Sequence, residues 1–141
     1  MPDTTTSGKL SRNMEMIKMM TNGNISVGKA LALAAKELSE NSTIETPRLD
    51  AEVLLCCVLD CERIYLVINK DYLLNDEQYK IFCDFLARRK NNEPVSYITG
   101  TREFMSLEFE VTSGVLIPRP DTEILVEKII EIYKGKKVKI L

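Results

Sequence analysis

Residues 46–59 of the chain read TPRLDAEVLLCCVL, and this stretch decides the fold. Thr46 followed by Pro47 predicts the start of a helix, because proline at the first helical position sacrifices no hydrogen bond. The first turn is polar and the remainder is apolar on nearly every side. A helix that is apolar all round needs partners all round. We therefore predict that residues 47–59 form the central, buried helix of a helical bundle.

Further helices are predicted on both sides of this one. Ser26 is the predicted N-cap of an upstream helix, whose apolar face is made by Val27, Leu31, Ala34, Ala35 and Leu38. Asn75 caps a downstream helix, with Gln78 at the capping-box position and a stripe of Tyr79, Phe82, Cys83 and Leu86. Between them, residues 64–68 suit a buried strand or a short helix equally well by periodicity, and their length and neighbours favour the helix.

The downstream helix ends on three basic residues, Arg88, Arg89 and Lys90. Cations are favoured there by the helix dipole. A solvated helix end is the favoured interpretation, and a phosphate contact is the alternative. Residues 25–92 are thus predicted to form a small helical domain. On folding, a domain of this size buries only about 60% of the surface that its unfolded chain exposes.

The composition is that of a soluble globular protein, with 45% apolar and 28% charged residues among 141 and a net charge of −2. There is no general basic field to attract nucleic acid or anionic lipid. No apolar run approaches the ~18 residues that span a bilayer, and the start of the chain does not resemble a secretory signal. We expect a cytoplasmic protein with no membrane contact and no direct binding of nucleic acid.

The four cysteines, at positions 56, 57, 61 and 83, form no CxxC pair, and the chain has no histidine. This composition removes most zinc-site patterns, so no metal site is predicted. It also excludes Ser-His and Cys-His catalysis within the chain. Cys56 and Cys57 lie in the apolar run VLLCCVL, where free cysteine usually acts as a small buried hydrophobic residue. A redox or metal role is the less favoured alternative.

Residues 1–24 are polar and hold five of the six methionines without a sustained period. We predict that they form a mobile leader with no function of its own.

The pattern changes after Pro94. Leu107, Phe109 and Val111 alternate with glutamates, which predicts a half-buried strand in a hairpin, with Tyr97 and Phe109 in its core. Residues 93–120 are therefore predicted to be a hairpin and extended linker.

Residues 121–141 have the pattern of a helix followed by a strand. Asp121 or Thr122 is expected to cap a helix that runs through Tyr133 and ends at Gly135. The apolar residues 138–141 look like the first strand of an α/β domain.

Residues 93–127, EPVSYITGTREFMSLEFEVTSGVLIPRPDTEILVE, closely resemble the linker signature of the HemK/PrmC methyltransferases. The specific part is IPRPDTE, at 117–123. Upstream, PRLDAEVLL at 47–55 and the Arg88–Arg89 pair match the family's helical N-terminal domain in order and spacing.

The resemblance implies a mainly α chain, in which a helical bundle and a β-hairpin linker precede a Rossmann-like domain that binds S-adenosyl-L-methionine. Such enzymes methylate the glutamine of the Gly-Gly-Gln motif of class I peptide chain release factors. The family's glycine-rich cofactor loop and Asn-Pro-Pro-Tyr motif are absent here. We expect the chain to stop in the first strand of that domain. It should then contain no catalytic or cofactor-binding residue, bind no cofactor and be inactive alone.

Four linker residues are candidates for a place next to the active site: Phe104, Arg119, Thr122 and Glu123. The family arrangement would bring them toward the cofactor side of the catalytic domain. Arg119 lies between two prolines that stiffen its backbone, but it could instead pair with a carboxylate such as Asp121 or Glu123. For Thr122 and Glu123, helix capping is favoured over substrate contact.

Three roles are open for the chain as a whole. Recognition of the release factor by residues 25–92 is favoured over structural bracing of the catalytic domain. An independent binding module, for example for nucleic acid, is least favoured, because basic and aromatic residues are not interleaved.

Overall fold

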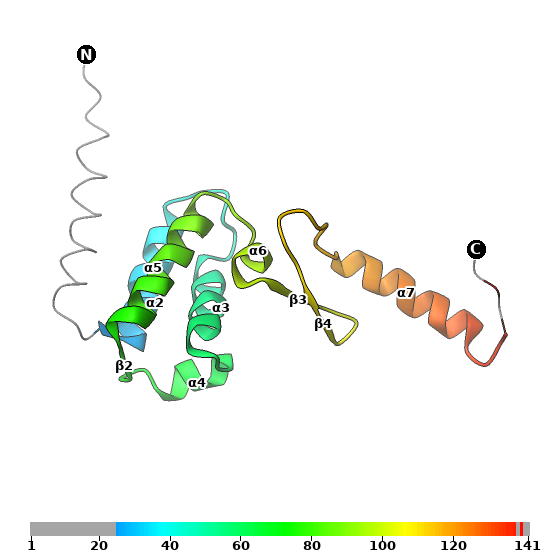
Figure 1. The fold of residues 1–141 in the computed structure, drawn as a ribbon, viewed down its shortest axis with the longest axis horizontal. Coiled ribbons are helices and arrows are strands. Elements are labelled where there is room, and N and C mark those ends of the chain that lie inside the picture. The colour runs from blue at the N-terminus through cyan, green and yellow to red at the C-terminus, as the bar shows by residue number, and fades with distance from the viewer. Residues whose placement is uncertain (1–24, 138, 140–141) are drawn as a thin grey trace, which may run out of the picture. The chain divides into compact units, whose positions relative to one another are not determined.

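The computed structural model describes residues 25–137 and Lys139, which divide between Ile98 and Thr99 into two compact units (Figure 1). The helical unit runs to Ile98 and the hairpin unit begins at Thr99. The leader predicted over residues 1–24 lies outside the described residues. So does the strand predicted over 138–141, apart from Lys139.

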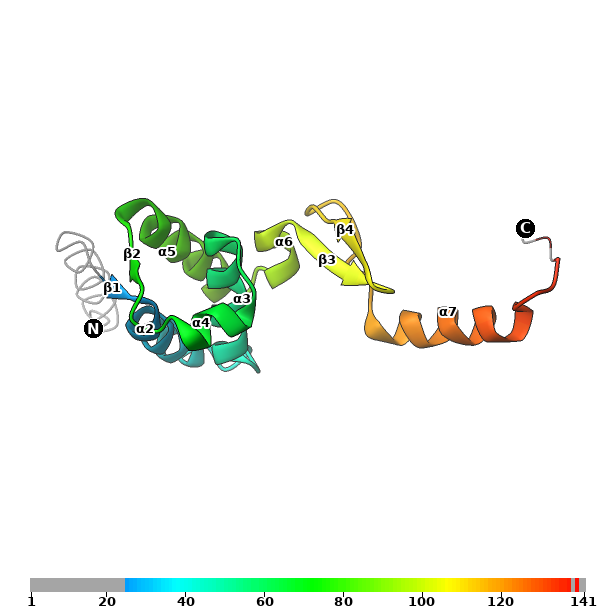
Figure 2. The same ribbon diagram turned by 90° about the horizontal axis from the view of Figure 1, so that it is seen from below.

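Three helices form the body of the helical unit: α2 (Val27–Ser39), α3 (Pro47–Leu59) and α5 (Asp76–Lys90). They pack against one another, with the short helix α4 (Arg63–Ile68) at one end of the bundle (Figures 1 and 2). The predicted caps are confirmed, since the Ser26 side chain accepts from the Lys29 N–H and Asn75 and Gln78 form a capping box. Local sequence signals thus place the starts of α2 and α5.

The core of the helical unit is made by apolar side chains from all three helices. Its largest fully buried members are Val27, Leu38, Leu54, Leu55 and Phe82. Ala30 contributes to the buried face of α2, whereas the predicted Leu31 and Ala35 are only half-buried. The prediction that α3 is buried on nearly every side is wrong, because Leu49 and Cys57 are exposed. A small bundle has too few helices to enclose one of them completely.

A two-stranded sheet that periodicity did not predict closes the end of the bundle near α4. Here β1 (Ile25–Ser26) pairs antiparallel with β2 (Leu73–Leu74). The Val27 N–H extends this pairing to the Tyr72 carbonyl at 2.9 Å. Strands of two residues are too short to show an alternating pattern.

The helix α6 (Val95–Thr99) follows the bundle, and its Ile98 side chain is buried in the core of the helical unit. Tyr97 lies in this helix, so its predicted place in the core of the ribbon is wrong. Gly100 follows the end of α6. Its φ of 79° is readily adopted only by glycine.

The hairpin unit contains the predicted β-hairpin, formed by β3 (Thr101–Phe104) and β4 (Leu107–Glu110). Phe104 pairs with Leu107, and Thr101 pairs with Glu110. Leu107 and Phe109 are exposed, whereas Val111 is buried. The expectation of a half-buried β4 is therefore wrong, as a two-stranded ribbon offers little cover to its own side chains.

The helix α7 (Pro120–Tyr133) follows, and Arg119 rather than Asp121 or Thr122 occupies its N-cap position. Proline is well suited to the first helical position, so Pro120 starts the helix earlier than expected. Gly135, with φ of 78°, lies just beyond its end, as predicted. None of the side chains of α7 is buried. Among the described residues, no helix is both long and apolar enough to cross a membrane.

Candidate functional site

Two of the four predicted site residues lie around the tip of the hairpin. Phe104 meets Phe109 edge to face, with ring centroids 6.2 Å apart and an interplanar angle of 73°. Met105 and Ser106 connect the strands with φ of 54° and 59°. Positive φ at both positions defines a type I′ turn, which normally favours asparagine and glycine. The tip therefore holds two residues in a backbone conformation that they rarely adopt.

Glu123 fastens this tip to the first turn of α7. Its Oε1 atom accepts a hydrogen bond of 2.8 Å from the backbone N–H of Met105. The favoured capping role of Glu123 is not observed, because its carboxylate is engaged by the turn 18 residues upstream. No sequence pattern predicts this contact, because it depends on how the hairpin packs against α7 within the unit.

The structure does not bring Arg119 and Thr122 into this contact. The Thr122 N–H donates to the Arg119 carbonyl at 3.0 Å, and neither side chain caps α7. Arg119 is exposed, and it forms no ion pair with any residue that the structure describes. The pairing with Asp121 or Glu123 is thus absent. A place next to an active site stays a prediction for Phe104, Arg119, Thr122 and Glu123.

We predict that Glu123→Ala loosens the hairpin tip, whereas Glu123→Gln, which keeps an acceptor oxygen, changes it less. Loss of this hydrogen bond should cost about 1 kcal/mol, because the site is only half-buried. Amide exchange at Met105 is the measurement, and it should accelerate in the alanine variant. Equal exchange rates at Met105 in the alanine variant and the parent chain would contradict this role.

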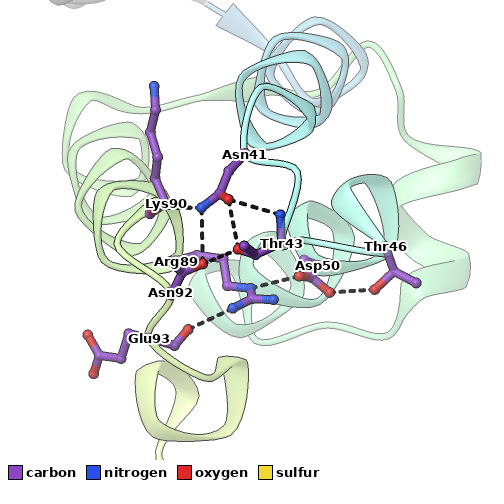
Figure 3. A network of polar contacts seen from close by, with 8 residues as sticks. All are labelled: Asn41, Thr43, Thr46, Asp50, Arg89, Lys90, Asn92 and Glu93. Atoms are coloured by element: carbon purple, nitrogen blue, oxygen red, sulfur yellow. Dashed lines mark hydrogen bonds and ion pairs between the residues drawn. The ribbon is translucent and has the colours of Figure 1, made fainter.

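A network of polar contacts joins the ends of three helices in the helical unit (Figure 3). The Asn41 side-chain amide donates to the Lys90 carbonyl and to Asn92 Oδ1, both at 3.0 Å. The Thr43 hydroxyl lies between Asn41 Oδ1 and Asn92 Oδ1. Asn92 adopts φ of 66°, which asparagine tolerates better than most residues. These contacts fix the loop after α2 against the end of α5.

Asp50 is the buried charged residue of this network. Its Oδ2 accepts from Arg89 Nε at 2.7 Å, and its Oδ1 accepts from the Thr46 hydroxyl at 3.0 Å. Arg89 also donates to the Glu93 carbonyl at 3.1 Å. The start of α3 is therefore tied to the end of α5 and to the loop that follows (Figure 3).

The two neighbouring basic residues also have acidic partners. Arg88 holds the Glu93 carboxylate through two guanidinium nitrogens, which lowers the pKa of Glu93. Lys90 pairs with Glu37 at 2.9 Å. The interpretation of Arg88, Arg89 and Lys90 as a solvated helix end is thus wrong. Asp50 and Glu37 lie 39 and 53 residues away in sequence, so no local pattern connects them. The Arg88–Arg89 pair has a structural role here.

An exposed apolar surface covers α4 and the turn that leads to β2. We call it the α4 patch, and it consists of Ile64, Tyr65, Val67, Ile68, Tyr72 and Leu73. Ile68 is 74% exposed, and the rings of Tyr65 and Tyr72 meet edge to face at 6.4 Å. Of the residues in α4, Leu66 alone is buried. Of the two alternatives for residues 64–68, the favoured short helix is confirmed, and the buried strand is not formed.

A charge cluster secures α4 to α3. Arg63 donates to Glu52 Oε2 at 2.7 Å, and Arg48 donates to Glu52 Oε1 at 3.1 Å. Burial by itself raises the pKa of Glu52, but the hydrogen bonds from the two arginines outweigh it, and the net pKa is lowered. The carboxylate therefore stays charged at neutral pH. Its ion pair with Arg63 joins α4, which carries most of the α4 patch, to α3.

Comparison with known proteins shows that residues 29–100, about half of the chain, match the PrmC N-terminal domain. A release factor glutamine methyltransferase of Buchnera aphidicola is 50% identical over 95 residues, covering 67% of this chain and 34% of the relative. Proteins of the same name are 40% identical in Clostridium botulinum, over 79% of this chain and 39% of the relative, and 46% identical in Coxiella burnetii, over 76% and 40%. The chain thus spans between a third and two fifths of the length of these relatives. It belongs to the HemK/PrmC family, and residues 29–100 are its PrmC N-terminal domain.

Proposed function

We propose that this chain is the N-terminal region of a release factor glutamine methyltransferase and that its helical unit recognises the release factor. The match of residues 29–100 to the PrmC N-terminal domain carries this proposal. Residues 25–92 then form the recognition domain and residues 93–120 the linker. Residues 121–141 begin a Rossmann-like α/β domain, whose remainder corresponds to the further length of the relatives.

The proposed reaction is methylation of the side-chain amide nitrogen of the glutamine in the Gly-Gly-Gln motif of a class I release factor. An amide nitrogen is a poor nucleophile because its lone pair is delocalised into the carbonyl group. Catalysis must therefore depend largely on holding the amide and the methyl donor in line. S-adenosyl-L-methionine supplies the reactive methyl group. Recognition of the release factor by the helical unit contributes to this positioning.

The described residues do not fit S-adenosyl-L-methionine. A cofactor loop needs glycines where the backbone approaches the ligand closely, usually in a turn between a strand and a helix. The hairpin unit contains isolated glycines, with no glycine-rich turn among its described residues. A Cβ added at Gly100, Gly114 or Gly135 would meet no atom within 4 Å. We therefore assign no step of cofactor binding to this chain.

We predict that the 141-residue chain does not bind S-adenosyl-L-methionine. Isothermal titration calorimetry with the cofactor at high concentration should give only heats of dilution. Saturable binding with micromolar affinity would contradict the assignment of the cofactor site to another part of the protein.

The α4 patch is the described surface that best suits a protein partner. Large exposed apolar patches on a folded domain mark interaction sites, and six large apolar side chains are exposed on and beside α4. Tyrosine is enriched where binding energy is concentrated, and the patch contains Tyr65 and Tyr72. The Arg63–Glu52 pair holds α4 in place, which reduces the ordering cost of binding. We assign the release factor as its partner because the relatives are named release factor glutamine methyltransferases.

We predict that Ile68→Asp weakens binding of the chain to a class I release factor at least tenfold, about 1.4 kcal/mol. A carboxylate in an apolar interface would lose its water without gaining a partner. The matched control is Ile81→Asp, because Ile81 is 40% exposed on α5, outside the patch. Calorimetry with purified release factor is the measurement. Equal affinities for the two variants would remove the α4 patch from the recognition surface.

A further inference from the structure

Two of the four cysteines come together at the end of α3. The backbone N–H of Cys61 donates to the Cys56 carbonyl at 3.1 Å, across Asp60, which has the left-handed φ of 50° and ψ of 53°. This bond is the one that closes a Schellman motif. Such a motif characteristically brings the side chains at its two ends into contact, usually as an apolar pair. Here both ends are cysteines.

The two thiols also interact directly. Their side chains lie close enough for each thiol to shift the pKa of the other, and both are half-buried. The other two cysteines are placed differently, since Cys57 is exposed and Cys83 lies on α5, one turn beyond Tyr79. The folded chain therefore selects one of its possible thiol pairs.

We propose that Cys56 and Cys61 are a redox-sensitive dithiol that a peroxide converts to an intramolecular disulfide. A disulfide requires Cα atoms that lie within about 7 Å of one another and Cβ atoms that face each other. The backbone hydrogen bond of 3.1 Å holds the two residues close together across the end of α3, and the mutual effect of the thiols on their pKa values indicates that the side chains are neighbours. The proposal stands independently of the proposed function in release-factor methylation.

Cys61 is the thiol that reacts first. Burial raises the pKa of both, and that of Cys56 reaches about 12. The neighbouring thiol raises the pKa of Cys56 further, whereas it lowers the pKa of Cys61. Because the thiolate is the nucleophile, oxidation is slow at neutral pH and accelerates as the pH rises.

The reaction proceeds in two balanced steps. The Cys61 thiolate attacks one oxygen of hydrogen peroxide, the O–O bond breaks, and a sulfenic acid and hydroxide form. The Cys56 thiolate then attacks the Cys61 sulfur, the S–S bond forms and hydroxide leaves. The two thiol protons neutralise the two hydroxide ions. In sum, two thiols are oxidised and one peroxide is reduced to two water molecules.

The cross-link would connect the last turn of α3 to the residue that lies two positions before α4 begins at Arg63. It would therefore restrict movement of the short connection between α3 and α4, and α4 carries most of the α4 patch.

Mass spectrometry of the chain after peroxide treatment and alkylation tests the proposal. We expect the folded wild-type chain to lose two hydrogens and to keep two of its four thiols open to alkylation, with all four restored by dithiothreitol. Cys57→Ser should form the cross-link as the wild type does, whereas Cys56→Ser and Cys61→Ser should not. Treatment in urea should remove the preference for this pair.

Several outcomes would overturn the proposal. These are a disulfide that includes Cys57 or Cys83, disulfides between chains only, or accumulation of sulfinic acid with no cross-link. The count of free thiols in the wild type is decisive even if a serine variant fails to fold.

Discussion

Replacement of Leu55 by alanine is expected to lower the free energy of unfolding of the helical unit by about 2–5 kcal/mol. Leu55 is fully buried in α3, within the core shared with α2 and α5. The substitution removes three carbon atoms and leaves a cavity that close-packed neighbours fill only in part. A loss of this size is a large share of the total stability of a small domain. Denaturation by urea, followed by circular dichroism, is the measurement.

Leu49→Ala is the matched control, because Leu49 lies on the same helix and is 40% exposed. It makes the same chemical change with much less cavity formation, so it should cost clearly less than Leu55→Ala. A melting temperature for Leu55→Ala within about 2 °C of the parent would contradict the position of the core, since 1 kcal/mol shifts it by several degrees in a domain of this size.

Replacement of Asp50 by alanine is expected to cost about 3 kcal/mol, the second largest effect. The Arg89 side chain is only 17% exposed, and it would lose the carboxylate that balances its charge. Thr46 would lose its hydrogen-bond acceptor at the same time. Removal of one member of a buried ion pair is more harmful than removal of both. The double variant Asp50→Ala/Arg89→Ala should therefore be more stable than the sum of the single effects indicates.

The control for Asp50 is Arg48→Ala. Arg48 also forms an ion pair, with Glu52, but its side chain is 83% exposed. Exposed pairs contribute at most about 1 kcal/mol. Equal stabilities of the Asp50→Ala and Arg48→Ala variants, measured by urea denaturation, would show that the buried network does not hold α3 to α5.

The parts of the fold that could be predicted from the sequence are those set by neighbouring residues. Ser26, Asn75 and Pro47 mark helix starts because a cap or a first-turn proline acts within one turn. The β-hairpin followed from the alternation at residues 107–111. The family was identified by a continuous signature in the linker, and the comparisons confirm it.

The parts that could not be predicted depend on residues that are distant in sequence. The partner of Arg89 is Asp50, on another helix, so the basic end of α5 was interpreted as solvated. The exposure of α4 was also not predicted, because the apolar pattern of a short helix does not show whether other parts of the folded chain cover it. The contact of Glu123 with Met105 likewise depends on the packing of the hairpin unit.

For the candidate site as well, a local signature could be recognised in the sequence, whereas contacts between distant residues could not be predicted. A signature indicated Phe104, Arg119, Thr122 and Glu123 as a group, yet the structure brings only two of them, Phe104 and Glu123, to the tip of the hairpin. The pairing of Cys56 with Cys61 depends on the left-handed conformation of Asp60. That conformation is uncommon for a residue other than glycine, and the sequence around it contains no glycine.

Deletion of residues 1–92 from a methyltransferase that carries this chain tests the central claim most directly. Affinity for a class I release factor and affinity for S-adenosyl-L-methionine would both be measured by calorimetry. If the helical unit recognises the release factor, the deletion should weaken release-factor binding strongly and leave cofactor binding unchanged. Loss of both affinities would contradict recognition as the main role and indicate structural bracing, and an unchanged affinity for the release factor would contradict it as well.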